Sequence, residues 1–218
     1  MEADAVEIRV VACLLEKQRT TPDAYPLSLN ALRLACNQAT NRDPVVEYDE
    51  ATVVDALRRT ALRGWTRLAS GAGSRARKYR HLLDDALGLD PAELSLLAVL
   101  MLRGTQTPGE LKQRADRLHP FADLAAVHEA LESLVERGHV ERLVRRPGQK
   151  EERYRQLLGG EPEQVDEPAR PTSPPSEAVP GDAPAEDRLE RLERELDELR
   201  EQVRQLREAL GEPSTPQA

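Results

Sequence analysis

Hydrophobic residues recur at helical spacing three times in the first third of the chain, and two short strand patterns follow them. Each helical stretch has a residue suited to cap or end it, and Gly71-Ala72-Gly73 marks a turn between the strands. The predicted elements are a helix over residues 6–15, a helix capped by Ser28, a helix opened by Asp49 or Glu50 and ended by Gly64, and strands at about 65–69 and 76–82. Three helices followed by a β-hairpin is the element order of a winged-helix domain.

The same order recurs further along the chain. The predicted elements are a helix beginning at Pro91, a short helix at about 107–117, a helix capped by Asp123, and strands at about 140–145 and 152–157 around a Pro147-Gly148 turn. Two matched segments indicate a duplication: Ala56-Leu57 recurs 74 residues later as Ala130-Leu131, and Lys78-Tyr79-Arg80 recurs 75 residues later as Arg153-Tyr154-Arg155. Both copies of the third helix also end in Arg-Gly.

The Thr-Pro pairs of the two copies, Thr21-Pro22 and Thr107-Pro108, are 86 residues apart. This larger offset predicts about twelve extra residues in the first copy. We expect these extra residues to lie between Tyr25 and Pro44.

Beyond the second copy the pattern changes twice. A stretch rich in Pro, Glu, Ser and Ala without periodicity predicts a disordered linker. Apolar residues then alternate at spacings of three and four, which is typical of a coiled-coil seam and favours self-association over a single helix docked on the domains. The seam consists of Leu189, Leu192, Leu196, Leu199, Val203, Leu206 and Leu210.

These patterns predict a mainly α protein with small β-hairpins, of the α+β class. It has two tandem winged-helix domains and a C-terminal coiled-coil helix. The predicted parts are winged-helix domain 1 at 1–84, winged-helix domain 2 at 85–158, a disordered linker at 159–183, the coiled coil at 184–210 and a disordered tail at 211–218.

Charge is distributed unevenly among these parts. The net charge of −8 comprises +3 for residues 1–83, −2 for residues 84–160 and −9 for residues 161–218, so the acidity belongs mainly to the tail. Cys13 and Cys36 lie in apolar helical patterns and are expected to be buried reduced thiols. No apolar stretch reaches the length of a membrane span, and the expected location is the cytoplasm.

The residues do not suggest catalysis. The four histidines lie on different predicted elements, and there is no Cys-x-x-Cys, no phosphate-binding glycine loop and no nucleophile elbow. We therefore expect a protein that is not an enzyme, with no metal site and no cofactor.

A basic stretch makes DNA a candidate partner. Between Ala56 and Leu83 there are eight cations and no acids: Arg58, Arg59, Arg63, Arg67, Arg75, Arg77, Lys78 and Arg80. They fall on the third helix and the hairpin, the parts with which winged-helix proteins contact DNA. Asp49, Glu50 and Asp55 at the start of that helix disfavour base readout, so contacts with phosphates and little sequence preference are expected. A solvated surface partly neutralised by the acidic tail is an equally open interpretation.

Protein docking is the alternative from a different class. The segment from 25 to 44 is rich in amides and prolines, and such a segment can bind a peptide or a second protomer. Its candidate partner-binding residues are Tyr25, Asn30, Asn37, Gln38, Asn41 and Arg42. For any one of these side chains, hydrogen bonding to local backbone is the simpler role.

Three runs of sequence resemble a known bacterial family. Residues 13–45, CLLEKQRTTPDAYPLSLNALRLACNQATNRDPV, resemble the signature of the YceH-like family, whose function is not known. RGTQTPGELKQRADRLHPFADLAAV at 103–127 and RPGQKEERYRQL at 146–157 are similar to the signatures of its second domain. The resemblance covers residues 6–158; it implies a tandem winged-helix fold and no activity.

Overall fold

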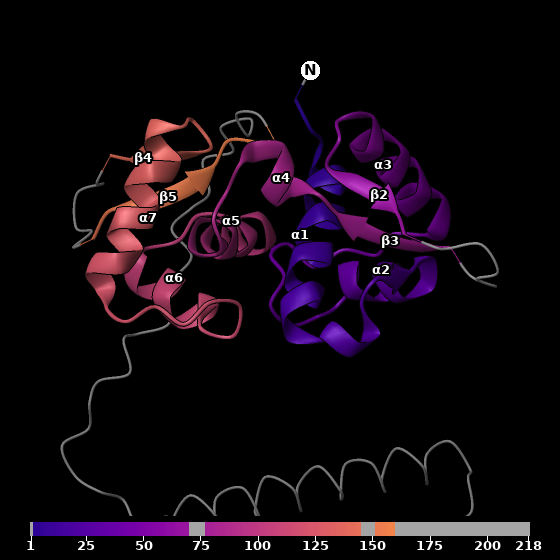
Figure 1. Ribbon diagram of the computed structural model, residues 1–218, viewed down its shortest axis with the longest axis horizontal. Coiled ribbons are helices and arrows are strands. Elements are labelled where there is room, and N and C mark those ends of the chain that lie inside the picture. The colour runs from indigo at the N-terminus through magenta and orange to yellow at the C-terminus, as the bar shows by residue number, and fades with distance from the viewer. Residues whose placement is uncertain (1, 70–76, 145–150, 160–218) are drawn as a thin grey trace, which may run out of the picture. The chain divides into compact units, whose positions relative to one another are not determined.

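The chain contains two successive copies of one arrangement of helices and strands. The computed structural model describes residues 2–69, 77–144 and 151–159 (Figure 1). The first copy consists of α1 (Ala5–Thr20), the 3-10 helix η1 (Pro22–Ala24), β1 (Leu27–Ser28), α2 (Leu29–Cys36), α3 (Glu50–Leu62), β2 (Thr66–Leu68) and β3 (Lys78–His81). The short helix α4 (Leu83–Leu87) follows. The second copy consists of α5 (Pro91–Arg103), α6 (Pro108–Ala115), α7 (Leu124–Glu136), β4 (Val140–Leu143) and β5 (Arg153–Gln156).

Each copy has a small antiparallel sheet, and the strands follow the same order in both. In the first copy β3 lies between β1 and β2, with Tyr79 opposite both Leu27 and Leu68. In the second copy β5 pairs with β4, and Gln106 forms an isolated bridge with Tyr154 in the place that β1 occupies in the first copy. The residue before the second helix therefore joins the hairpin in both copies.

Side-chain caps begin the three main helices of each copy. A cap oxygen accepts an N–H that the first helical turn leaves without a partner. The equivalent N-caps are Asp4 and Asp90, Ser28 and Thr107, and Asp49 and Asp123, which are 86, 79 and 74 residues apart. The offset falls by seven and then by five, so the twelve extra residues of the first copy are divided between two places.

This division corrects the predicted position of the insertion. Seven of the extra residues lie between the caps of α1 and α2, because α1 has 16 residues against 13 in α5 and η1 follows it. The other five lie between α2 and α3. The counterpart of Thr107 is Ser28 and not Thr21, since each of the former two caps the second helix of its copy.

The two copies share one hydrophobic core. Residues 7–15 of α1 and 93–102 of α5 are buried without interruption, as expected for helices enclosed on all sides. The two helices pack against each other at the centre of Figure 1, and the buried apolar side chains of both copies form one continuous cluster. The N–H of Asp43 also donates to the carbonyl of Leu102 at 2.8 Å, which ties the segment after α2 to α5.

The structure confirms a mixed fold of helices and small antiparallel sheets. It adds η1, β1 and α4, which the hydrophobic pattern did not predict, and extends the first helix from residue 15 to Thr20. Cys13 and Cys36 are buried and not paired in a disulfide, as expected. Within 2–69, 77–144 and 151–159, no helix is both long enough and apolar enough to cross a membrane.

Several predictions concern residues beyond this description. The turns at Gly71-Ala72-Gly73 and Pro147-Gly148, the coiled coil at 184–210 and the tail at 211–218 lie outside the described residues, as does the linker beyond Gly159. The domain boundaries at 84/85 and 158/159 stay predictions.

Candidate nucleic-acid interface

The eight cations predicted to contact nucleic acid fall into three groups. Arg75 lies outside the described residues. Arg59 and Arg63 form ion pairs with the beginning of α1. The remaining five are exposed or half-exposed: Arg58, Arg67, Arg77, Lys78 and Arg80.

Arg63 neutralises a buried carboxylate. It is the C-cap residue of α3, and its Nε donates to Oε1 of Glu7 at 2.9 Å. The Glu7 side chain is only 2 % exposed; it also accepts the N–H of Asp4, and Nε of Arg59 lies 3.4 Å from it. Burial alone would raise the pKa of Glu7, but the N–H of Asp4 and the charge of Arg63 outweigh burial, and the pKa lies below its usual value.

The second copy repeats this ion pair. Arg137 is the C-cap residue of α7, and its Nη1 donates to Oε2 of Glu93 at 3.0 Å, while Oγ of Ser133 donates to Oε1 of Glu93 at 2.6 Å. Arg63 and Arg137 are 74 residues apart, and each is followed by a glycine with positive φ. Because each copy pairs this arginine with the equivalent glutamate of its first helix, the arginine serves the fold. The shared Arg-Gly ending of the third helices was the sequence signal for this role.

The hairpin of the first copy presents two arginines side by side. Arg67 on β2 is directly opposite Arg80 on β3, so both side chains lie on one face of the sheet. Their neighbours Thr66 and His81 are buried on the other face. Among the described residues, no carboxylate lies within ion-pair distance of Arg67 or Arg80, and the sequence has no acidic residue between Ala56 and Leu83.

The equivalent position in the second copy holds an ion pair. There Glu141 is directly opposite Arg155, and Nε of Arg155 donates to Oε2 of Glu141 at 2.6 Å. Arg142 on the same strand is also paired with carboxylates, those of Glu132 and Glu152. Like charges directly opposite each other on a sheet are destabilising, whereas opposite charges stabilise the pair. The first hairpin therefore has a repulsion at the position where the second has an attraction.

The outward face of α3 is only weakly basic. Its exposed residues include the apolar side chains of Val54 and Leu62, of which Leu62 is 84 % exposed. Asp55 accepts a hydrogen bond from Arg59, and Arg58 is exposed on the same helix. A face on which apolar side chains are prominent is poorly suited to reading base edges, for which amide and guanidinium groups are the usual donors.

The six side chains predicted to bind a partner belong to a well-connected segment. The Tyr25 hydroxyl accepts the N–H of His81, and Asn37 exchanges two hydrogen bonds of 2.9 Å with the backbone of Tyr48. Gln38 accepts from Arg42 and Lys17. Asn41 accepts from Arg103 on α5, and Asn30, which is exposed, accepts from Arg33.

Arg42 is the only one of these six side chains that is buried. Its two Nη atoms donate to the two carboxylate oxygens of Glu16 on α1, at 3.1 and 2.5 Å, and its Nε donates to the carbonyl of Ala35 at 3.0 Å. Its guanidinium fork therefore anchors the segment on α1 and on the end of α2. The segment's polar side chains stabilise this region, and a role in partner binding stays a prediction.

His81 is a buried titratable group beneath the first hairpin that the sequence did not single out. Its Nδ1 accepts the N–H of Leu83 at 3.3 Å, and its Nε2 lies 2.5 Å from Oε1 of Gln18. These partners suit the neutral ring with a proton on Nε2. Burial lowers the pKa of His81 to about 4, although Asp84 acts in the opposite direction.

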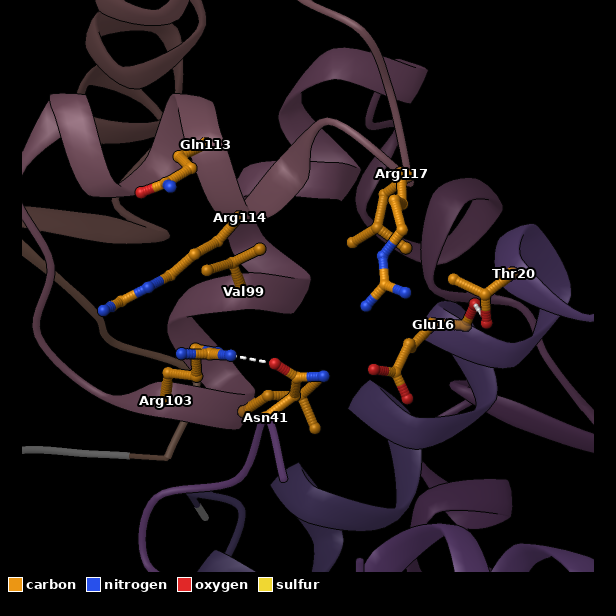
Figure 2. A pocket seen from close by; sticks show the side chains of 10 residues that line it. Glu16, Thr20, Asn41, Val99, Arg103, Gln113, Arg114 and Arg117 are labelled. Carbon is orange, nitrogen blue, oxygen red and sulfur yellow. Dashed lines mark hydrogen bonds between the residues drawn. The ribbon is translucent and has the colours of Figure 1, made fainter. Parts of the chain in front are cut away.

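No metal centre is formed by the residues that the structure describes, since no three His, Cys, Asp or Glu side chains gather at ligand distance there. The described residues do form a pocket of about 300 Å³ between the two copies. Figure 2 shows Arg103 reaching Asn41 from one side and Arg117 extending toward Glu16 from the other. Arg114 also lines this pocket, and the sequence reading missed all three arginines.

Comparisons with known proteins place the chain in a family. Residues 3–149 match the model of the family described as "Protein of unknown function, DUF480". The chain belongs to this family. It is 50 % identical over 203 residues to a UPF0502 protein of Geotalea uraniireducens, covering 92 % of this chain and 91 % of that protein. It is 44 % identical over 218 residues to the UPF0502 protein YceH of Salmonella paratyphi B, covering 97 % of this chain and 99 % of that protein.

These relatives confirm the resemblance to YceH-like proteins. The residues matched by the family model run from the cap of α1 to beyond β4 and end before β5. The family description assigns no activity, so a function for this chain has to be argued from its own surface.

Proposed function

We propose that this DUF480 family member is a non-enzymatic, tandem winged-helix protein that contacts the phosphates of duplex DNA without reading its sequence. The contact surface is the hairpin formed by β2 and β3, called the basic hairpin below, together with Arg58 on α3. Because DNA in bacteria lies in the cytoplasm, the proposal also places the protein there.

The winged-helix assignment is supported by the order of the elements and the strands. A short strand precedes the second helix of the first copy, and the sheet order β1-β3-β2 joins that strand to the returning strand of the hairpin. The bridge between Gln106 and Tyr154 provides the same connection in the second copy. In proteins with this fold that bind DNA, the third helix and the hairpin face the duplex.

The observation that carries the proposal is the pair Arg67 and Arg80. The fold can accommodate an ion pair here, because the second copy has one between Glu141 and Arg155. Placing two cations opposite each other costs stability without benefiting the packing of the hairpin. Adjacent phosphates of a nucleic acid would remove that repulsion and supply the missing anions.

The outward face of α3 supports phosphate contact over base readout. Val54, Asp55 and Leu62 offer no donors for base edges, so affinity should depend on salt and hardly on sequence. Fluorescence anisotropy with the full chain and two unrelated 20-base-pair duplexes tests this at about 50 mM salt. We expect affinities that agree within about threefold; binding to neither duplex, or to one of them alone, contradicts the proposal.

A second candidate function is protein docking, and the specific observation in its favour is the exposure of Val54 and Leu62 on α3. Apolar side chains on the face that other winged-helix proteins turn toward DNA suit a protein partner better than phosphates. In-cell cross-linking separates the two functions. Docking predicts that Leu62→Lys loses a cross-linked protein that Arg67→Glu retains; identical cross-linked proteins in wild type and both variants contradict docking.

We also propose that the chain forms homo-oligomers through the coiled coil at 184–210, on the basis of its apolar seam. Light scattering of the full chain at about 30 μM should give the mass of an oligomer, and Leu199→Glu should reduce it to a monomer. A monomeric wild-type chain at that concentration contradicts this part of the proposal.

A further inference from the structure

The pocket between the two copies is built from four separate segments. Glu16 and Thr20 come from α1, and Asn41 comes from the segment between α2 and α3. The other walls are formed by α5 and by one continuous stretch that runs from α6 to Leu118. The two copies together therefore create a cavity that neither would form alone.

Cations outnumber anions in this pocket. Its one carboxylate, Glu16, is already bound by both Nη atoms of Arg42. Arg114 has an ion pair with Glu110 at 3.3 Å. For Arg103 and Arg117, no carboxylate lies within ion-pair distance in the part of the chain that the structure describes.

Arg103 is the clearest case of a cation without an anion. Its guanidinium donates to the neutral amide oxygen of Asn41, which fixes its direction without compensating its charge (Figure 2). Burial lowers the pKa of Arg103, and the charges of Arg114 and Arg42 lower it further, although Glu16 and Asp43 act in the opposite direction. The protein therefore holds a partly buried positive charge without a direct ion pair, and a bound anion would offset its cost in free energy.

The duplication indicates that the fold itself does not need two of the three arginines, Arg114 and Arg117. At the offset of 79 residues that relates α6 to α2, Ala35 corresponds to Arg114 and Gln38 to Arg117. By contrast, the arginines that serve the fold, Arg63 and Arg137, occur in both copies. At the offset of 86 residues that relates α5 to α1, Arg103 corresponds to Lys17, which is also a cation. Arg114 and Arg117 belong to the second copy alone, which points to a role other than folding for these two.

We propose that this pocket binds a small organic anion whose phosphate or carboxylate group lies between Arg103 and Arg117. The carbon part of the ligand lies against the apolar wall formed by Val99, Leu102 and Leu118. Guanidinium groups match such oxyanions through two parallel N–H donors. A volume of about 300 Å³ is at the small end of ligand pockets and suits a metabolite. The site is separate from the basic hairpin, so the inference does not depend on DNA binding.

Calorimetry and thermal unfolding of the full chain with inorganic phosphate, pyrophosphate and citrate test this site, each against sodium chloride of equal ionic strength. At about 100 times its Kd, a bound probe should raise Tm by about 5 °C or more. Binding of the phosphates alone identifies a phosphorylated ligand, and binding of citrate alone identifies a carboxylate. Failure of all three probes to bind more tightly than about 10 mM overturns the inference.

Variants locate any binding that is observed. Arg117→Gln should weaken binding at least about tenfold, because it removes a charged donor from an exposed side chain on which the fold does not depend. Arg103→Gln should have the same effect, and if that variant fails to fold, Arg117→Gln decides alone. Lys112→Gln, on α6 but outside the pocket, is the matched control and should bind as wild type does. Unchanged affinity in Arg117→Gln overturns the inference.

Discussion

Arg67→Glu should separate the stability of the basic hairpin from its proposed binding. The substitution gives the first copy the charge pattern of the second, in which Glu141 is directly opposite Arg155 and its Oε2 lies 2.6 Å from Nε of Arg155. The new carboxylate would be directly opposite Arg80 and could form the equivalent ion pair. The fold should accept this change, because the related hairpin already contains it.

Arg67→Glu should increase the stability of the fold and decrease the affinity for DNA. A cross-strand pair contributes about 0.2–1 kcal/mol, so replacing repulsion by attraction should stabilise the fold by up to about 1 kcal/mol. That corresponds to an increase in Tm of about 2–4 °C for a chain of this size. Each phosphate contact adds about −0.9 to the slope of log K against log salt concentration. Between 1 M and 50 mM salt, one contact therefore contributes about 15-fold in affinity. DNA affinity should fall by at least this factor, since the carboxylate also repels phosphate.

Thermal unfolding and fluorescence anisotropy on the same preparations measure both effects. Glu141→Arg is the matched control, because it introduces the repulsive pair into the second copy and should lower Tm without weakening DNA binding. A variant Arg67→Glu that binds DNA as tightly as wild type would refute the assignment of the hairpin. A fall in its Tm of several degrees would refute the reasoning that the arginine pair is a cost to the fold.

Two further predictions concern the buried polar groups. Arg63→Ala leaves the Glu7 carboxylate buried without its main partner and should lower the free energy of unfolding by about 3 kcal/mol. The control Arg58→Ala on the same helix should change the free energy of unfolding by less than about 0.5 kcal/mol. Equal Tm values for the two variants would contradict the structural role of Arg63. His81 is neutral when folded, and its pKa of about 4 lies below the ordinary value of 6.5, so the folded state binds fewer protons than the unfolded state. Stability should therefore fall by up to about 3 kcal/mol between pH 6.5 and pH 4. Urea unfolding across this range should lose that slope in His81→Gln and keep it in His128→Gln, and a slope that survives in His81→Gln counts against the assignment.

Helix positions followed from the sequence wherever a local signal existed. The sequence predicts caps at Ser28 and Asp123 and a helix start at Asp49 or Glu50. The side chains of Ser28, Asp49 and Asp123 each accept the N–H of a residue three positions later. The first helix was predicted too short because its last turn is polar. That turn is stabilised by distant partners instead, such as His81, which contacts Gln18.

Elements that depend on distant partners could not be read locally. The strand β1 has two residues and exists through pairing with Tyr79, about fifty positions away. The insertion was misplaced for a related reason, since a Thr-Pro pair at the end of α1 resembles the Thr-Pro pair that caps α6.

The candidate sites show the same limit. Counting charges gave a basic stretch, but it could not separate Arg63, which pairs with Glu7 56 residues earlier, from Arg67, which has no such partner in the described chain. The repeated Arg-Gly ending would have made that distinction. The pocket around Arg103 had no sequence signal, because it draws on four segments that only the packing of α1 on α5 brings together.

The most direct test of DNA contact through the basic hairpin is the salt dependence of binding by the full wild-type chain. Anisotropy with a random-sequence duplex between about 20 and 200 mM salt gives the slope of log K against log salt concentration. The five exposed or half-exposed cations allow a slope of up to about −4.5, and we predict a value between about −2 and −4.5. A slope shallower than −1, or no binding at 20 mM salt, would contradict the central claim.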